Sequence, residues 1–438
     1  MAKHTPKTIT VILLLMIAAL SVLAVTLPQA EYPAVGEQTD SDLPTAEPPT
    51  DVQNPDGAGD GSDDVDTDVD TDITPEPFTP IPPEPSAVYA YTQTLWAEGG
   101  VRLNAAINTA NGQYVIITHA GKEGALNVLG EKTVSVLLLE TDGTVSALRH
   151  LKGGDSYLNA RITSEGLTVV TAGNGKSYVH ILSAELNDEH ATEMPICTAA
   201  QVYSLNEGFL LFLTNADQTS AYKFNDGVIT ASGSILGGTI ADVYDFIEYY
   251  LLAVKGIQGY SIVKLSPTLT PVTTINIPEK ALLSITPIPS EGGQKYLVVE
   301  RGASGVEVIK TDFNTDFARV GVGLAESAEA YMNGESILLL LHADSTRLYM
   351  VDYDLNFSSS TALKGAVERI FDCVSFDGGY KLLYTDGEKL NLLRIDRDGK
   401  TISGNFGAFD GEAALTDADG RETVFYTVGD SLKIIGVQ

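Results

Sequence analysis

The sequence predicts an all-β domain built from a repeated unit of four strands. Three observations support this prediction. From Gly112 onward, a glycine-containing turn, an apolar strand, a short polar turn and a second apolar strand recur every 40 to 45 residues or so. A further turn, such as Asp142-Gly143 or Asp398-Gly399, then leads into another strand. The strands are rich in Val, Ile, Leu and Tyr, which favour extended backbone.

Glycine marks the same turn in nearly every unit. We attribute its use there to the positive φ that such a turn needs. The fourth unit departs from the pattern and has Glu248 in the equivalent place. A fixed period of this size, filled with strands, predicts a β-propeller of four-stranded blades. The marker glycines are Gly112, Gly166, Gly208, Gly293, Gly334, Gly379 and Gly420.

The two ends of the repeat region complement each other. The last unit contains three predicted strands, Glu412–Thr416, Glu422–Val428 and Ser431–Val437, and one unassigned strand, Tyr89–Trp96, precedes the first full unit. We predict that Tyr89–Trp96 completes the last blade and closes the ring, which protects edges that an open array would expose. Seven complete units and one shared unit give eight blades. Seven blades remain the alternative if one unit has been divided wrongly.

Residues 89–438 resemble the β-propeller superfamily, specifically the loose WD40-like and quinoprotein-like propellers of bacterial envelope proteins. The resemblance rests on the period and the strand pattern. The diagnostic motifs differ, because Trp96 is the single Trp of the chain and no Trp-Asp dipeptide occurs. The resemblance implies that the fold is a scaffold and that its loops carry the function.

The N-terminus carries a long apolar run. Ile9 to Leu27 spans nineteen residues without a charge, and Lys3 and Lys7 precede it. Such a run is long enough to cross a bilayer as a helix, and the positive-inside rule places the C-terminal domain outside the cell. Residues 1–27 are therefore predicted to be a single-pass membrane anchor. The alternative is a signal sequence cleaved near Val22-Leu23-Ala24, which would leave a secreted protein.

Residues 28–88 are predicted to be a disordered, Pro- and Asp-rich linker. The segment holds sixteen Asp and Glu and no Lys or Arg, and it is too poor in apolar residues to offset the entropy of ordering. Alternating aspartates between Asp60 and Asp72 suggest weak calcium binding, but they lack the spacing of an EF-hand loop. We therefore favour a solvated spacer and predict no other cofactor.

The charge of the chain narrows the range of partners. The net charge is −31, and −17 of it lies in residues 89–438. This balance argues against nucleic acid, whose phosphates need a basic face, and against docking on anionic lipid. We expect a monomer whose partner is an envelope protein or glycan that the sequence does not identify.

The sequence shows no recognisable catalytic constellation. The six histidines lack metal-ligand spacing, although His119 and His342 both follow second strands and should lie on one rim of the ring. Glycoside cleavage needs two carboxylates at a fixed separation, and acids with aromatic neighbours occur in the fourth and seventh units. Strand alternation explains these acids as well, so we predict no catalytic, cofactor-binding or metal-binding residue. The acids are Asp242, Asp245, Glu248, Asp372 and Asp377.

The two cysteines are predicted to be free. Cys197 belongs to the third unit and Cys373 to the seventh, nearly opposite each other in an eight-blade ring. That separation far exceeds the Cα distance of about 7 Å that a disulfide can bridge. We expect two buried, inert thiols.

These observations favour an exported, membrane-tethered propeller that acts as a non-catalytic binding or protein-interaction module at the cell envelope. Two alternatives stay open. One is an extracellular hydrolase acting on glycans or peptides, which buried carboxylates at the central channel would favour. The other is a structural envelope scaffold, which an exposed apolar surface would favour.

Overall fold

The computed structural model describes residues 89–437. Short gaps interrupt this range at 97–99, 110–111, 121–131, 217, 237, 247, 257–258, 279–280, 289–294, 303–304, 313–315, 333–335, 364–366, 377–378, 397–400, 408 and 419–420. The predicted membrane anchor and acidic linker, residues 1–88, lie outside the described residues. Within the described part of the chain, we find no helix with the length and apolarity that a membrane span requires.

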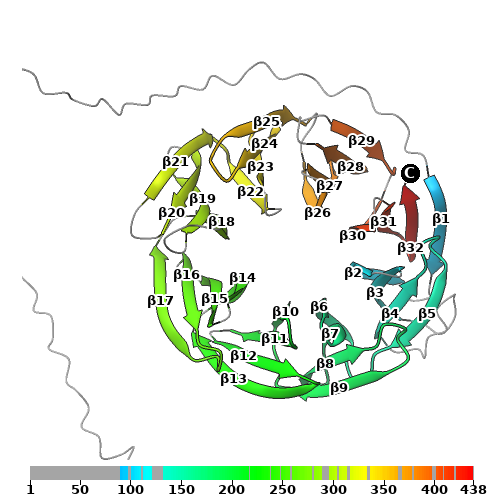
Figure 1. Ribbon diagram of the computed structural model, residues 1–438. Helices are drawn as coiled ribbons and strands as arrows, with labels where there is room; N and C mark the ends of the chain where they lie inside the picture. The colour runs from blue at the N-terminus through cyan, green and yellow to red at the C-terminus, as the bar shows by residue number, and fades with distance from the viewer. Residues whose placement is uncertain are drawn as a thin grey trace, which may run out of the picture. The chain divides into compact units, whose positions relative to one another are not determined.

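The described residues form a ring of eight four-stranded antiparallel sheets (Figure 1). This arrangement confirms the predicted β-propeller and the count of eight blades. Within blades 1 to 7 the strands follow chain order from the innermost strand to the outermost. Each innermost strand therefore faces the centre of the ring.

The first four blades have the following strands. Blade 1 contains β2 (Val101–Thr109), β3 (Gly112–His119), β4 (Thr133–Leu139) and β5 (Val145–His150). Blade 2 contains β6 (Ser156–Thr163), β7 (Gly166–Gly173), β8 (Lys176–Leu182) and β9 (Glu189–Met194). Blade 3 contains β10 (Ala199–Ser204), β11 (Phe209–Asn215), β12 (Gln218–Asn225) and β13 (Val228–Leu236). Blade 4 contains β14 (Thr239–Phe246), β15 (Tyr249–Gly256), β16 (Gly259–Leu265) and β17 (Pro271–Pro278).

The remaining blades complete the ring. Blade 5 contains β18 (Ala281–Ile288), β19 (Lys295–Gly302), β20 (Gly305–Thr311) and β21 (Asp316–Gly323). Blade 6 contains β22 (Ser327–Met332), β23 (Ser336–His342), β24 (Thr346–Asp352) and β25 (Phe357–Ala362). Blade 7 contains β26 (Arg369–Phe376), β27 (Gly379–Thr385), β28 (Leu390–Ile395) and β29 (Thr401–Asn405). Blade 8 contains β30 (Ala413–Ala418), β31 (Arg421–Val428), β32 (Ser431–Val437) and, outermost, β1 (Tyr89–Trp96).

The strand that precedes the first full unit closes the ring, as predicted. β1 runs antiparallel to β32, with Thr94 opposite Lys433 and Trp96 opposite Ser431. The Lys433 Nζ also donates a hydrogen bond of 2.8 Å to the Thr94 Oγ1. The blade that ends the chain is thus completed by a strand more than 300 residues away in sequence, and the outer edge of β32 is covered.

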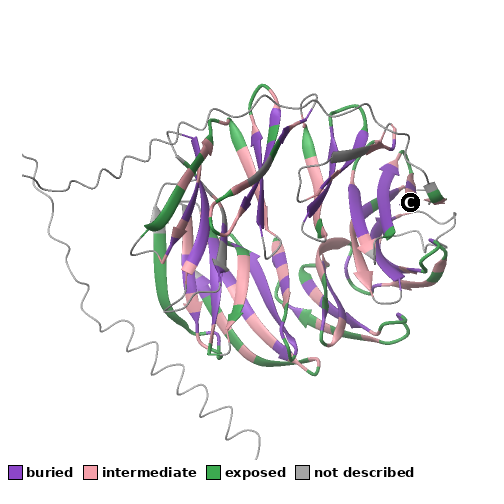
Figure 2. Ribbon diagram, turned by 45° about the horizontal axis from the view of Figure 1, so that its top comes forward, coloured by how far each residue is buried: buried purple, intermediate pink, exposed green. Residues whose placement is uncertain are grey.

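The core lies between the blades. Eight apolar clusters occur among the described residues, and each joins two neighbouring blades. The second strands are the most buried, as in β11 and β23, whereas the outermost β21 is mostly exposed (Figure 2). Strands buried on both faces read as continuous apolar runs, which explains Phe209–Leu213 and Ile337–Leu341.

The marker glycines have a second cause besides φ. Gly166 and Gly208 do have positive φ, 124° and 77°. In addition, a Cβ on Gly166 would lie 2.3 Å from the Leu182 carbonyl oxygen, and one on Gly208 would lie 1.9 Å from that of Phe224. The turn therefore presses against the third strand of its own blade, and a side chain would clash there. Gly293, Gly334 and Gly420 lie outside the described residues.

Both cysteines are free, as predicted. Cys197 is buried beside Ser177, and burial raises the pKa of its thiol. The expectation that both are buried was wrong in part, because Cys373 is only half-buried. Cys373 lies on the innermost strand β26, most of whose residues are only half-buried.

Candidate functional site: a cavity at the channel mouth

A cavity of about 630 Å³ opens on one face of the ring. On this face, which we call the start face, the innermost strands begin and the second strands end, as Val101 opposite His119 shows. The walls come from four consecutive blades: residues 100–104, 118–120 and 132 of blade 1 and its approach, 156–157 of blade 2, Arg369 of blade 7, and Glu412 and Gly429 of blade 8. The lining includes the starts of the innermost strands β2, β6 and β26. The cavity therefore lies on the start face near the ring axis, a position that we call the channel mouth.

Cationic side chains dominate the charge of the cavity wall. Arg102 on β2 and Lys132, just before β4, are both exposed, and neither makes a hydrogen bond or ion pair with another described residue. Arg369 at the start of β26 does have a partner, because its Nη2 lies 2.7 Å from the Glu412 Oε2. The described lining residues therefore carry a formal charge of +2, in a propeller whose own residues sum to −17.

A chain of three polar side chains leads away from the cavity through blade 1. The His119 Nε2 lies 2.7 Å from the Ser135 Oγ, which in turn lies 2.8 Å from the His150 Nδ1. Burial and the neighbouring His150 lower the pKa of His119 to about 4, and burial also lowers that of His150. Both rings are therefore neutral near pH 7, and one nitrogen of each carries the proton. The buried His119 Nδ1 has no partner among the described residues.

Neutral polar groups complete the wall. The Asn104 Nδ2 donates a hydrogen bond of 2.8 Å to the Thr118 Oγ1. Tyr157 at the start of β6 also lines the cavity, and burial raises its pKa to about 12, so the phenol stays protonated. The cavity thus offers charged donors at its rim and neutral donors deeper in.

Blade 2 contains a second histidine cluster, which has the order of a catalytic triad. The Thr171 Oγ1 lies 3.0 Å from the His180 Nε2, and the His180 Nδ1 lies 2.8 Å from the Glu189 Oε1. Such an order of hydroxyl, imidazole and carboxylate can activate a nucleophile. Here, however, Thr171 and His180 are both 0 % exposed, so a substrate has no access to the hydroxyl.

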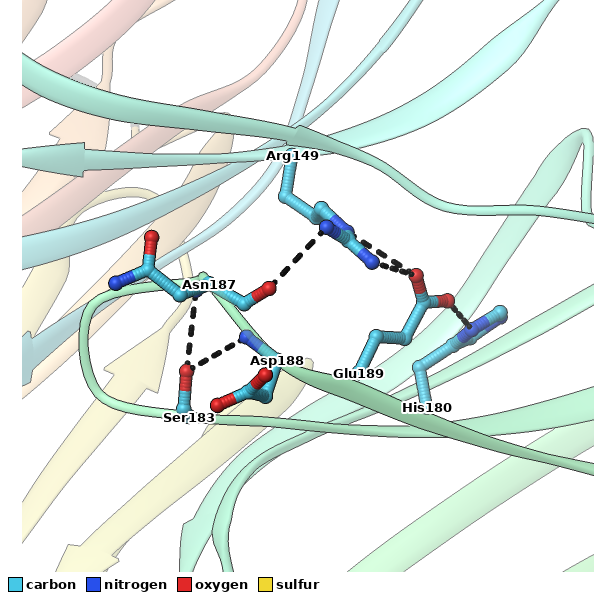
Figure 3. Close-up of polar contacts among 6 residues, drawn as sticks. All are labelled: Arg149, His180, Ser183, Asn187, Asp188 and Glu189. Carbon is cyan, nitrogen blue, oxygen red and sulfur yellow. Dashed lines mark hydrogen bonds and ion pairs between the residues drawn. The ribbon is translucent and has the colours of Figure 1, made fainter.

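The same cluster joins two blades, which gives it a structural role. The other carboxylate oxygen of Glu189 accepts hydrogen bonds from Arg149 Nε and Nη2, at 3.1 and 2.9 Å, and Arg149 belongs to β5 of blade 1 (Figure 3). The hydrogen bond with His180, together with the Arg149 contacts, lowers the pKa of Glu189. Sequence reasoning missed this contact between blades 1 and 2.

The structure does not bring the acids of the fourth unit together. The Asp242 carboxylate accepts hydrogen bonds from the Tyr244 hydroxyl, at 2.7 Å, and from the Val243 backbone N–H, at 2.8 Å. Asp245 and Glu248 are exposed. Residues three apart on a strand point to opposite faces, so Asp242 and Asp245 diverge. Phe246 instead stacks on Tyr249, with ring centroids 4.8 Å apart.

Asp372 occupies the same place in blade 7 as Asp242 in blade 4. Both follow a register shift in the innermost strand, between Ile370 and Asp372 and between Ile240 and Asp242. The Asp372 Oδ2 accepts a hydrogen bond of 3.1 Å from the backbone N–H of Leu415 in blade 8, and burial raises its pKa. Asn159, which follows the corresponding shift in blade 2, accepts one from Val202 in blade 3. Asp377 lies outside the described residues.

The two rim histidines do lie on one face, as predicted, but they belong to separate blades. His119 ends β3 in blade 1 and His342 ends β23 in blade 6. The His342 Nε2 lies 3.4 Å from the Glu329 Oε1, and this neighbouring imidazole lowers the pKa of Glu329. Among the described residues, no group of three or more His, Cys, Asp or Glu could hold a metal ion.

One sequence signal could have located the contacts between blades. The partners Arg149 and Glu189 are 40 residues apart, Arg369 and Glu412 are 43 apart, and Asp372 and Leu415 are also 43 apart. These separations equal the blade period. Polar residues spaced by one period are therefore candidates for contact across a seam between blades.

The architecture defines the fold: the described residues form an eight-bladed β-propeller. BamB from Moraxella catarrhalis is similar in structure, with a TM-score of 0.51 and 11% identity, and the match covers 80% of this chain and 99% of BamB. The dihydro-heme d1 dehydrogenase NirN in complex with DHE matches with a TM-score of 0.49 and 13% identity over 82% of each chain. No protein-family model matches the chain, and no curated protein matches its sequence. At these identities the likeness describes the fold alone.

Proposed function

We propose that this protein is an exported, membrane-tethered β-propeller that acts as a non-catalytic binding module outside the cell. The cavity at the channel mouth carries the proposal, because it is a concave site lined by four blades, three of which contribute side-chain donors. The apolar run at residues 9–27 supplies the tether, and residues 28–88 supply a spacer. Cleavage near Val22-Leu23-Ala24 would make the same module a secreted one.

The cavity suits binding better than hydrolysis. Glycoside cleavage needs two carboxyl groups facing one bond, and the single carboxylate on the cavity wall, Glu412, is paired with Arg369 among the described lining residues. The half-buried acids of the innermost strands, Asp242 and Asp372, hydrogen-bond to their own blade or to the next. These contacts give the two acids a structural role.

Site-specific photo-crosslinking tests the proposal. A photoreactive residue is placed at Arg102 or at Lys132 in the full chain, expressed in the cells from which it derives. The control position is Thr274 on the exposed outermost strand β17. We expect the same crosslinked envelope partner, protein or glycan, from both cavity positions and not from Thr274. Products that are equal at all three positions, or absent at both cavity positions, would contradict the proposal.

A structural scaffold is a second candidate, favoured by one observation. Apolar side chains are exposed on the outermost strands of three consecutive blades: Val228 on β13 (62 % exposed), Val272 on β17 (61 %) and Phe317 on β21 (47 %). A scaffold would bury this side against other proteins. In that case Val272→Lys should release the chain from a large assembly in native electrophoresis. An unchanged migration would remove the scaffold reading.

A further inference from the structure

The cavity combines unpaired cations with a domain of the opposite charge. The propeller is acidic overall, yet Arg102 and Lys132 of blade 1 line the same recess and make no ion pair with another described residue. A cleft lined by one sign of charge concentrates field lines and attracts ligands of the other sign. The recess is thus a place where an acidic domain can attract an anionic ligand.

One buried polar group at the same recess also lacks a partner among the described residues. His119 lines the cavity, is 1 % exposed, and has no partner for its Nδ1 among the described residues. Buried polar atoms are seldom left unpaired in folded proteins. When the Ser135 hydroxyl donates to the His119 Nε2, the proton of His119 resides on Nδ1, and His150 can in turn donate to Ser135. That tautomer offers a neutral N–H donor next to the two cations.

Arg369 is a third cation of the cavity wall, and it already has a partner. Its guanidinium lies 4.6 Å from the Phe371 ring centroid and pairs with Glu412 across the seam between blades 7 and 8. Arg369 is half exposed, so this ion pair is weak and can exchange partners. A guanidinium presents two parallel N–H donors that match the geometry of a carboxylate.

We propose that the cavity at the channel mouth binds carboxylate groups, as the acidic side chains of a peptide segment of the partner would present them. Arg102 and Lys132 supply the charge, the His119 Nδ1–H supplies a donor directly or through a retained water, and Arg369 joins when it leaves Glu412. This inference rests on the proposed binding function and names the chemistry of its ligand. A small free dicarboxylate would offer the same groups, so the experiment distinguishes the two sources.

The test uses the full chain in detergent micelles and isothermal titration calorimetry. The probes are an acetylated, amidated tetraglutamate peptide, the matching tetraglutamine peptide and succinate. We expect the tetraglutamate peptide to bind, with an affinity that falls as salt rises from 50 to 300 mM, and the tetraglutamine peptide not to bind. If succinate binds as tightly as the tetraglutamate peptide, the ligand is a small dicarboxylate and not a peptide. Equal binding of the neutral peptide would overturn the proposal.

Variants assign the binding to the cavity. Arg102→Gln and Lys132→Gln together should weaken tetraglutamate binding by about tenfold or more, since each removes a charge-assisted donor. Glu412→Gln should strengthen it a few-fold, because it releases Arg369. Arg319→Gln on the outermost strand β21, which removes one exposed cation of the same charge, should leave the affinity unchanged. Equal losses in the cavity and Arg319 variants would show that only net charge matters and would contradict the site.

The two proposals fail separately. If crosslinks at Arg102 and Lys132 capture a partner but tetraglutamate does not bind, the binding function stands and the carboxylate assignment is wrong. If neither occurs, both are wrong. The four substituted side chains are all at least partly exposed in the described structure: Arg102, Lys132, Arg319 and Glu412. We therefore expect unchanged thermal melting of each variant, which serves as the folding control.

Discussion

The last blade has two seams, and their chemistry differs. Towards blade 1, β31 and β32 contribute Phe425, Leu432 and Ile434 to an apolar cluster that Val101 and Leu103 complete. Towards blade 7, buried charges lie beside the apolar residues. The Lys381 ammonium contacts Asp417 and lies 2.9 Å from the Glu422 Oε1, and the Arg394 Nε donates a 3.0 Å hydrogen bond to the other oxygen of Glu422.

The difference shows two ways of fixing neighbouring blades. The apolar seam gains from many small contacts, so its stability is distributed. The charged seam depends on complete pairing, because removing one partner leaves a buried charge alone. The apolar seam also includes the closing strand. Tyr91 of β1 fits its ring between Gly436 and Gly143, where an added Cβ would lie 2.3 Å from a ring carbon in each case, and its hydroxyl lies 3.0 Å from the Thr423 Oγ1.

The harshest way to break the apolar seam is to delete β1, residues 89–96. The deletion removes the β1–β32 ladder and Tyr91, and it exposes the edge of β32. We expect the melting temperature to fall by about 10 °C or more because the whole ladder is lost, although each kcal/mol shifts the midpoint of so large a domain by only about 1–2 °C. Differential scanning calorimetry measures the shift. An unchanged melt would show that β1 does not close the ring.

The charged seam is broken by Glu422→Gln. Lys381 and Arg394 then lose a shared partner, and Lys381 is almost fully buried. We expect a loss of about 3 kcal/mol, the low end for a buried pair that loses one member, because Lys381 keeps its contact with Asp417. Chemical denaturation compares it with Arg319→Gln, which removes two surface ion pairs, with Glu307 and Asp316, each worth about 0–1 kcal/mol. Equal losses of stability in the two variants would mean that burial does not strengthen the ion pairs of the charged seam.

A pH titration tests the stability of blade 1, which forms one side of the apolar seam. His119 is on blade 1, and its folded-state pKa of about 4 lies below the value of about 6.5 for an unfolded chain. Between these values the unfolded chain binds more protons, so stability is full above about pH 6.5 and falls as the pH drops towards 4. The loss should be on the order of 3 kcal/mol. Urea midpoints at pH 7 and 4.5 measure it.

The control for that titration is His119→Gln. This variant should show a shallower loss between pH 7 and 4.5, because one proton-binding site of the unfolded chain is gone. The carboxylates with lowered pKa, such as Glu189, titrate equally in both proteins and cancel in the comparison. Identical slopes would show that His119 is not held neutral by the fold.

The smallest expected effect is that of Tyr91→Phe. The variant keeps the ring between the two glycines and removes only the hydroxyl contact with Thr423. Since Thr423 also accepts a hydrogen bond of 2.8 Å from the Gln113 Nε2, it keeps one partner. We expect a loss of about 1 kcal/mol by urea denaturation. A loss as large as that of the β1 deletion would mean that the hydroxyl, and not the ladder, holds the closure.

The sequence predicted the ring well because each blade repeats the same local instructions. Apolar second strands, turn glycines and the strand Tyr89–Trp96 are all visible in the printed residues, and β1 has the predicted boundaries. The register shifts of the innermost strands were not predicted. A single extra residue, such as Phe371, changes no pattern that a reader can see, yet it decides that Asp372 reaches Leu415 in the next blade.

The candidate site was harder to predict, because it is assembled from distant segments. Arg102, Lys132 and Arg369 come from blades 1 and 7, which are far apart in sequence, and no motif joins them. His119 was recognised as a rim residue, but its chain to Ser135 and His150 depends on side-chain packing within blade 1. The local sequence pattern predicts each blade, but only closure of the ring brings these residues together.

The most direct test of the closed ring is a crosslink across the closing seam. In the full chain with Cys197→Ser and Cys373→Ser, Thr94→Cys and Lys433→Cys place two thiols on paired residues of β1 and β32. A matched control places the first thiol at Thr94 and the second at Thr274 in blade 4. The account predicts that mild oxidation gives an intramolecular disulfide, identified by mass spectrometry, in the first protein and not in the control. Absence of that disulfide in the Thr94→Cys/Lys433→Cys protein, or a crosslink only between two molecules, would contradict closure by the chain's own β1.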